Sequence, residues 1–185
     1  MSAVAFTRRL VRGGSYRRRA VSVRVNGAHV ASGFVVGRGV VVVPKLPERA
    51  RMRDAISIEG RRPVAVLDGG EFLVLVDVGF ANVPRLPAGG WARPENLRVF
   101  AHNGVESREV VDQIGRVQRG QTSDRVFVVR VEKSAVPGNE KAFVGAGLVA
   151  RGRLVSVVSG VSVGDDDVVE YVAVDPDVVR WVLRQ

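Results

Sequence analysis

The stretch that decides the fold runs from Ser32 to Lys45 and reads SGFVVGRGVVVVPK. Two apolar runs are separated by Gly37, Arg38 and Gly39. Glycine takes the backbone conformations of a tight turn without steric cost, and β-branched valine fits a pleated sheet better than a helix. The stretch therefore predicts a β-hairpin whose second strand ends just before Lys45.

Short apolar runs of the same kind continue on both sides of this hairpin. Residues 21–25 alternate valine with polar side chains, and the Asn26-Gly27 pair that follows is a strong signal for a tight hairpin turn. With the later runs, this pattern predicts about six strands and a first β-barrel over residues 20–82.

The composition changes after the first barrel. Residues 83–94 hold three prolines and a glycine pair, which predicts a linker. Further strand-like runs then predict a second barrel over residues 95–174, and these runs are 97–101, 105–116, 125–131, 142–149, 153–158 and 168–174.

The last segment, residues 175–185, has the signals of a helix. Asp175 is a suitable N-cap, and Pro176 suits the first helical position. Val178, Trp181 and Val182 have the spacing of one helix face. We therefore expect Trp181 to pack against the second barrel together with the two valines.

Four segments, in this order along the chain, resemble the trypsin-like serine proteases. In that family a hairpin of the pattern Ser-Gly-apolar-apolar, turn, Val-Val-Thr-Ala-Ala-His ends on the catalytic histidine, and Ser32–Lys45 is similar to it. The other three are the strand 71–76, the glycine-containing segment 144–149, and the closing strand and helix of 170–183. The resemblance covers residues 20–185. It implies an all-β fold of two six-stranded antiparallel β-barrels with a short C-terminal helix.

The same resemblance implies that the catalytic triad has been replaced. The histidine slot falls on Lys45, the aspartate slot on Glu71 and the serine slot on Val144. A lysine is ordinarily a protonated ammonium at pH 7, so it cannot accept the serine proton as imidazole does, and valine has no nucleophilic atom. We therefore expect a pseudoprotease, with Lys45 and Glu71 forming an ion pair in the cleft between the barrels.

The remaining candidates for catalysis are few. The two histidines, His29 and His102, lie outside the catalytic slot and lack a metal-ligand partner at zinc-like spacing, so we expect ordinary surface or turn histidines. The chain has no cysteine, which excludes a cysteine nucleophile. None of the serines of the second barrel stands in a Gly-x-Ser-Gly elbow; they are Ser107, Ser123, Ser134, Ser156, Ser159 and Ser162. We expect neither a metal nor another cofactor.

The composition limits the number of domains and the cellular location that we expect for the protein. With 185 residues, 46% of them hydrophobic, the chain can form a sizeable core in one or two small domains. The lack of cysteine fits a bacterial, intracellular or viral setting. No apolar run approaches the roughly 20 residues of a membrane span, and the N-terminus lacks the apolar core of a signal peptide. A cytoplasmic or virion location is favoured over secretion, without a membrane partner.

The charge of the chain points to a polyanionic partner. Its formal net charge is +9, and among its 28 basic residues only Lys45, Lys133 and Lys141 are lysine. Arginine pairs with phosphate bidentately, which suits RNA. GC-rich codon usage accounts equally well for the overall arginine excess, but not for its clustering in residues 1–19. This segment predicts a basic arm, mobile until it meets RNA or another polyanion, and its arginines are Arg8, Arg9, Arg12, Arg17, Arg18 and Arg19.

Two functions from different classes follow. The first is a catalytically inactive binding or structural component of a larger assembly, such as a viral capsid-like protein or a complex subunit, that contacts RNA or another polyanion through its arm. Protein partners or self-assembly fit this function, and the cleft between the barrels could serve as a peptide groove. The alternative is an active serine hydrolase with a non-standard catalytic arrangement, for example a serine assisted by Lys45.

Overall fold

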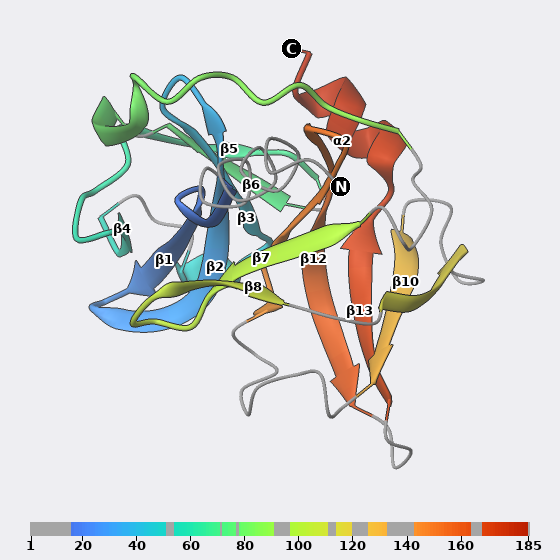
Figure 1. Ribbon diagram of the computed structural model, residues 1–185. Helices are drawn as coiled ribbons and strands as arrows, with labels where there is room; N and C mark the ends of the chain where they lie inside the picture. The colour runs from blue at the N-terminus through green and yellow to red at the C-terminus, as the bar shows by residue number, and fades with distance from the viewer. Residues whose placement is uncertain are drawn as a thin grey trace, which may run out of the picture.

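The computed structural model describes residues 16–50, 54–70, 72–76, 78–90, 97–110, 114–119, 126–132, 143–163 and 168–184. Within these ranges the chain forms two antiparallel sheets and one α-helix near the C-terminus (Figure 1). Two short 3-10 helices, η1 (Glu48–Ala50) and η2 (Val78–Phe80), lie in the connections of the first half.

The first sheet has the spatial order β4-β1-β2-β3-β6-β5. Its strands are β1 (Ala20–Val25), β2 (Ala28–Gly37), β3 (Val40–Pro44), β4 (Ile56–Ile58), β5 (Ala65–Asp68) and β6 (Phe72–Val76). The predicted hairpin is β2 with β3, and the φ angles of Gly37, Arg38 and Gly39 are 118°, 52° and 77°. Because L side chains rarely adopt such angles, the glycines on both sides of Arg38 let the chain turn here.

The second sheet has the order β8-β7-β11-β12-β13-β10-β9. Its strands are β7 (Arg98–His102), β8 (Ser107–Val110), β9 (Ile114–Arg119), β10 (Val126–Glu132), β11 (Gly147–Ala150), β12 (Arg153–Val163) and β13 (Val168–Val174). The predicted run 105–116 is divided into two strands, because β8 pairs with β7 whereas β9 pairs with β10. The all-β class with two antiparallel sheets is confirmed, and the second sheet has seven strands instead of six.

An apolar cluster joins the two sheets and the helix. It combines Phe34 and Phe72 of the first sheet, Phe100 and Leu154 of the second, and Val179 of the helix, all 0% exposed. A Cβ at Gly147 would overlap the Phe34 ring, so glycine lets β11 pack directly on β2. Each sheet also has a core cluster of its own, and the shared cluster fastens the two sheets to each other.

The linker between the sheets is hydrogen-bonded to both of them. The Arg38 amide donates to Val83 O at 2.9 Å, and the Leu86 amide donates to Val36 O at 2.7 Å, beside the β2–β3 hairpin. Further along, the Gly89 amide donates to Leu154 O at 2.7 Å. In Figure 1 this segment runs over both sheets toward the C-terminal helix.

The C-terminal helix is α2 (Pro176–Val182), and its N-cap is as predicted. The Asp175 carboxylate accepts a hydrogen bond from the Asp177 amide at 2.7 Å, with Pro176 in the first turn. The prediction for Trp181 is wrong: its side chain is 65% exposed, whereas Val179 is completely buried. The helix contacts β12 but is rotated so that Val179 enters the shared cluster and Trp181 lies on the outside.

Within the described part of the chain, no helix combines the length and the apolar character that crossing a membrane requires.

Candidate functional site

Lys45, in the slot of the catalytic histidine, directly follows β3 and is exposed. Its Nζ donates a hydrogen bond to the backbone oxygen of Gly70 at 2.7 Å and lies 3.8 Å from Oδ1 of Asp68. Asp68 ends β5, so a turn of the first sheet brings these groups together. The side chains of Lys45 and Asp68 are 42% and 57% exposed, and an ion pair open to solvent contributes at most about 1 kcal/mol.

Glu71, in the slot of the catalytic aspartate, lies outside the described residues. The expected ion pair between Lys45 and Glu71 therefore stays a prediction. The carboxylate that Lys45 meets among the described residues belongs to Asp68. The resemblance assigns the acid slot to Glu71, because Asp68 belongs to the preceding strand, β5.

Val144, in the slot of the nucleophile, lies in a turn that packs against the β2–β3 hairpin. Its backbone oxygen accepts a hydrogen bond from the Ser32 amide at 2.8 Å. A Cβ at Gly145 would overlap the Ser32 carbonyl oxygen and lie 2.8 Å from Pro44, the residue before Lys45. The turn and the end of β3 are thus adjacent, as the resemblance implies.

The backbone of this turn is occupied by hydrogen bonds within the protein. The Gly145 amide donates to Val158 O at 2.7 Å, and the Ala146 amide donates to Phe143 O at 2.9 Å. A substrate oxyanion needs free N–H donors aimed at it. These two amides are not available for that purpose. In the family the donors are the amides of the nucleophile and of the second residue before it, which correspond to Val144 and to residue 142, and residue 142 lies outside the described residues.

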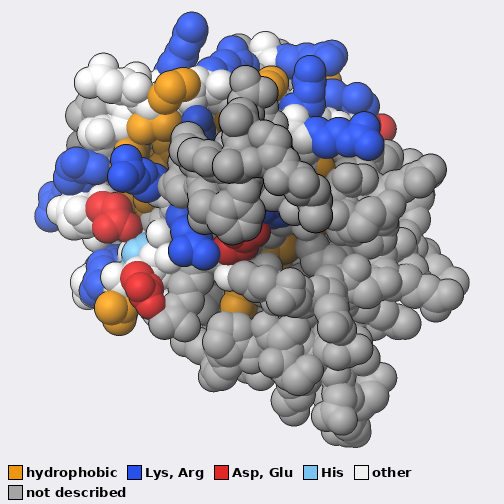
Figure 2. Space-filling model, in the orientation of Figure 1, with side chains coloured by type: hydrophobic (Ala, Val, Ile, Leu, Met, Phe, Trp, Pro, Cys, Tyr) orange, Lys and Arg blue, Asp and Glu red, His pale blue; other side chains and the backbone are white. Residues whose placement is uncertain are grey.

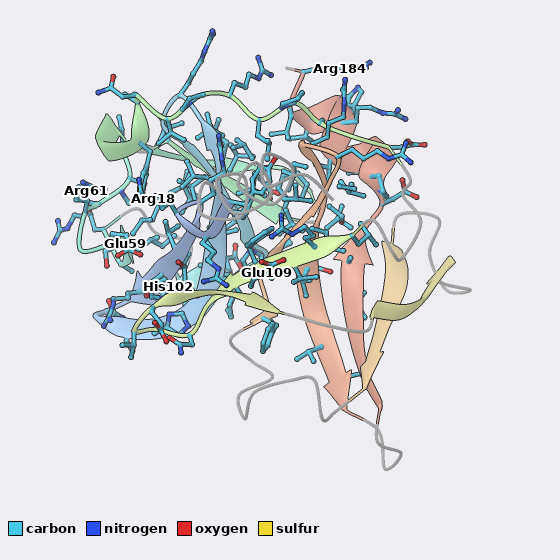
Figure 3. The ribbon with its side chains drawn as sticks, viewed as in Figure 1. Arg18, Glu59, Arg61, His102, Glu109 and Arg184 are labelled. Carbon is cyan, nitrogen blue, oxygen red and sulfur yellow. The ribbon has the colours of Figure 1, made fainter. Side chains whose placement is uncertain are left out.

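The two histidines lie together at the junction of the sheets, although they are far apart in sequence. The ring centroids of His29, from β2, and His102, from β7, are 6.0 Å apart. Nδ1 of His29 lies 2.9 Å from Ser22 Oγ, and Nε2 of His102 lies 3.7 Å from Oε1 of Glu59. Figure 3 shows Glu59 and His102 where the first sheet meets β7 and β8.

Burial controls the protonation of both histidines. His102 is 7% exposed, and its Nδ1 accepts a hydrogen bond from the Gly104 amide at 2.9 Å, which places the ring proton of the neutral form on Nε2, facing Glu59. Desolvation lowers the pKa of His29 and of His102, and Arg24 lowers both further. The expectation of an ordinary surface or turn histidine is wrong for His102, which is buried at the end of β7, whereas His29 is half-buried. The two rings meet because the sheets dock, which no local sequence signal reports.

The arginines of the predicted arm fall into three groups. Arg8, Arg9 and Arg12 lie outside the described residues, whereas Arg17 and Arg18 are exposed. Arg19 is 6% exposed, and its Nη1 and Nη2 donate to Val35 O at 3.1 Å and Pro84 O at 2.9 Å.

Burial lowers the pKa of Arg19, and its guanidinium binds backbone carbonyls of the hairpin and the linker. Arg19 therefore fastens the base of the arm to the protein body and is not offered to a partner. We exclude it from the proposed polyanion contacts.

Basic side chains dominate the described surface outside the arm as well. Figure 2 shows Lys and Arg side chains along the upper and left edges of the visible face, with few acidic ones among them. Among the residues whose exposure the structure describes, the exposed arginines outside the arm are Arg38, Arg61, Arg62, Arg85, Arg151, Arg153 and Arg184.

Known structures match this fold, although sequences do not identify it. No protein-family model matches the chain, and no curated protein matches it. An inactive-form serine-to-alanine mutant of Rv3671c from M. tuberculosis has 13% identity and a TM-score of 0.59, with 92% of this chain and 87% of that chain covered. Human heparin binding protein has 14% identity and a TM-score of 0.59, with 92% of each chain covered.

A third solved structure, the HRV-C 3C protein with rupintrivir, has 17% identity and a TM-score of 0.52, with 88% of this chain and 96% of that chain covered. At these identities the likeness concerns the fold and not the activity. The chain has the trypsin-like serine protease fold.

Proposed function

We propose that this protein is a pseudoprotease that serves as a binding or structural component of an assembly and contacts a polyanion, RNA foremost, through its basic arm and arginine-rich surface. The observation that carries the proposal is the set of contacts that Lys45 makes. The Lys45 ammonium, at the position that the resemblance assigns to the catalytic histidine, is bound to Gly70 O and Asp68, and the neighbouring turn has Val144 at the position assigned to the serine.

The loss of activity follows from proton transfer. The family's mechanism needs a neutral base that accepts the serine proton and later returns it to the leaving group. Lys45 donates a hydrogen bond to Gly70 O and faces Asp68. A lysine side chain is ordinarily an ammonium at pH 7, which has no lone pair to accept the serine proton. Val144 adds no nucleophile. Proton transfer therefore lacks its base, and the attack on the substrate carbonyl lacks its nucleophile.

The polyanion contact is supported by charge and by one structural neighbour. Arg17 and Arg18 are exposed at the base of the arm, and further arginines lie on the described surface. Human heparin binding protein, a neighbour in fold, is named for binding heparin, which is a polyanion. A phosphate backbone offers the same chemistry to exposed guanidinium groups.

The absence of catalysis is tested with a fluorophosphonate serine probe and with casein as a substrate, using trypsin as the positive control. We expect neither labelling nor casein fragments at pH 7 to 8. Covalent labelling of any serine in the folded protein would contradict the proposal that it is a pseudoprotease.

RNA binding is tested by filter binding across a salt series, with full-length protein and a chain lacking residues 1–15. Each neutralised phosphate adds about 0.7 to 0.9 to the slope of log affinity against log salt, so losing Arg8, Arg9 and Arg12 should flatten the slope by about 2 to 3. A triple glutamine variant at Arg62, Arg151 and Arg153 is the charge-matched control.

The control decides what the arm contributes. We expect the triple variant to lose less affinity and less slope than the truncated chain. If the truncated and full-length chains bind RNA with equal affinity and equal salt slope, the arm does not contact RNA and we would assign it to contacts with proteins. Equal losses in both variants would assign binding to the whole basic surface.

One observation favours a serine hydrolase as the second candidate. Ser22 Oγ lies 2.9 Å from Nδ1 of His29, a distance at which a histidine can activate a serine. However, Ser22 is 2% exposed, so a substrate carbonyl cannot reach its oxygen without local opening. If the fluorophosphonate probe did label the protein and Ser22→Ala abolished the labelling, this second candidate would replace the first.

A further inference from the structure

An open groove of about 970 Å³ lies between α2 and the first sheet. Its walls are apolar and come from β5, β6 and α2; they include Leu67, Val74, Val76, Val178, Trp181 and Val182. This volume is at the upper end of the roughly 300–1,000 Å³ that is typical of ligand pockets. Val144 and Lys45 do not line the groove, but Asp68 and Gly70, which contact Lys45, lie in its wall, so Lys45 borders it.

The largest apolar side chains of the two walls are open to solvent. Trp181 on the helix is 65% exposed, and Leu67 on β5 is 54% exposed. Soluble proteins rarely leave such side chains together on a concave apolar surface unless something binds there.

One end of the groove carries two arginines. Arg38 is the turn residue of the β2–β3 hairpin, and Arg85 belongs to the linker that crosses this hairpin. A Cβ at Gly37 would overlap the Arg85 backbone, so the two segments are in direct contact and the two arginines start from neighbouring points. Arg85 Nη2 donates to the backbone oxygen of Leu183, at the end of the helix.

Two arginines and two aspartates line the groove, and counting the basic partners of the aspartates leaves an excess of positive charge. Both carboxylates of the lining already have a basic partner, since Asp68 faces Lys45 at 3.8 Å and Asp177 pairs with Arg180. Neither Arg38 nor Arg85 forms an ion pair with a carboxylate of the described residues. The groove is therefore complementary to a ligand with an apolar body and an anionic end.

The hydrogen bonds of the walls discriminate between an extended peptide and a hydrocarbon chain. Strand β6 is paired with β3 on one side and with β5 on the other, so its backbone groups are occupied, whereas β5 is the last strand of the sheet and pairs with β6 alone among the described strands. An extended peptide that lies along β6 would leave its own N–H and C=O groups without protein partners, which is unfavourable; only a peptide added along the outer edge of β5 would find them. A hydrocarbon chain brings no such groups, and its anionic head meets the guanidinium groups.

We propose that this groove binds a long-chain carboxylate. Its acyl chain lies between Trp181 and Leu67, and its carboxylate contacts Arg38 and Arg85. This binding is independent of any contact with RNA.

The test uses the tryptophan that lines the groove as the reporter. The full-length chain with Trp91→Phe, in which Trp181 is the single tryptophan, is titrated with palmitate below its aggregation range and with hexadecanol as the uncharged analogue. We expect palmitate to shift the Trp181 emission to saturation at one ligand per chain. Because a charge-assisted contact is lost, hexadecanol should bind about tenfold more weakly.

Variants then identify the charged end. In the double variant Arg38→Gln with Arg85→Gln, palmitate should bind about tenfold more weakly, while hexadecanol binding stays the same. The matched control, Arg62→Gln with Arg151→Gln, removes two exposed arginines that do not line the groove and should bind palmitate as the parent does. Far-UV circular dichroism verifies that each variant is folded.

Several outcomes overturn the proposal. One is no saturable palmitate binding by fluorescence or calorimetry; another is equal binding of hexadecanol and palmitate. A concentration-dependent dimer in sedimentation that Trp181→Ser abolishes would assign the groove to a second copy of the chain. Binding that occurs only after removal of residues 1–15 would assign it to that segment.

Discussion

At the scale of single residues, several polar side chains in the interior contact partners that are distant in sequence. Arg19 bonds to the hairpin and the linker, and His29 contacts His102 from the other sheet. A buried polar group without a hydrogen-bond partner lowers stability, so replacing one member of such a pair and measuring the free energy of unfolding tests the contact.

Arg19 is predicted to contribute measurably to stability. Replacing Arg19 with methionine keeps much of its apolar volume but leaves the oxygens of Val35 and Pro84 without their donor, so the free energy of unfolding should fall by about 1 to 3 kcal/mol. Urea unfolding of Arg18→Met, at an exposed neighbour, should change by less than about 0.5 kcal/mol. Equal effects would mean that Arg19 is not anchored.

The histidine pair predicts that stability falls in mild acid. Burial lowers the pKa of His29 and His102 in the folded chain, so below the unfolded value, near 6.5, the unfolded chain binds more protons. The free energy of unfolding should therefore decrease as the pH falls from about 7 through 6 toward the lowered pKa values. Glu59 and Glu106 oppose this decrease at His102, while Arg24 adds to it.

The measurement is urea unfolding at pH 7.5, 6.5 and 5.5. The double variant His29→Gln with His102→Gln should lose less stability between pH 7.5 and 5.5 than the parent does, because it lacks the titrating rings. An identical pH dependence in both proteins would assign the acid sensitivity to carboxylates elsewhere.

At the scale of elements, the sequence was sufficient to predict a turn or a helix cap whose geometry depends on neighbouring residues alone. The Gly37-Arg38-Gly39 turn and the Asp175 cap were predicted because their geometry involves adjacent residues. The rotation of α2 was not, because Val178 and Val179 fit an apolar stripe equally well and packing selects between them. The division of the 105–116 run likewise depends on its pairing with two different strands.

The turn at Val144 depends on a glycine that has no room for a side chain. Gly145 has a φ of 88°, and a Cβ there would overlap the Ser32 oxygen. Gly145→Ala should lower the free energy of unfolding by about 2 kcal/mol or more, since strain from positive φ adds to the clash.

Gly60 supplies the matched control. It has a φ of 78°, and a Cβ added there would meet no atom within 4 Å, so Gly60→Ala should cost only about 1 kcal/mol for the backbone strain. Equal destabilisation of the two variants in urea would contradict the close contact between the turn and the hairpin.

At the scale of the whole molecule, the resemblance in four segments was enough to predict the two-sheet fold and the adjacency of the Lys45 and Val144 slots. The partners of Lys45 could not be predicted. The contact with Asp68 requires the β5–β6 turn to approach the end of β3, and the resemblance pointed to Glu71 instead.

The two sheets are predicted to unfold together. They share one apolar cluster with α2, so losing either sheet exposes side chains of the other. Far-UV circular dichroism, which reports both sheets, and tryptophan fluorescence, to which Trp181 contributes, should give coincident urea transitions with one midpoint. Two separate midpoints would mean that the sheets are independent folding units.

The linker has a mechanical consequence. The hydrogen bonds of its described part, residues 83–90, to the β2–β3 hairpin and to β12 fasten that part along both sheets. A hinged protein closes on its partner and spends part of its binding free energy on that motion. We expect the two sheets to keep one relative arrangement instead, so that a binding partner has to fit the spacing that they already hold.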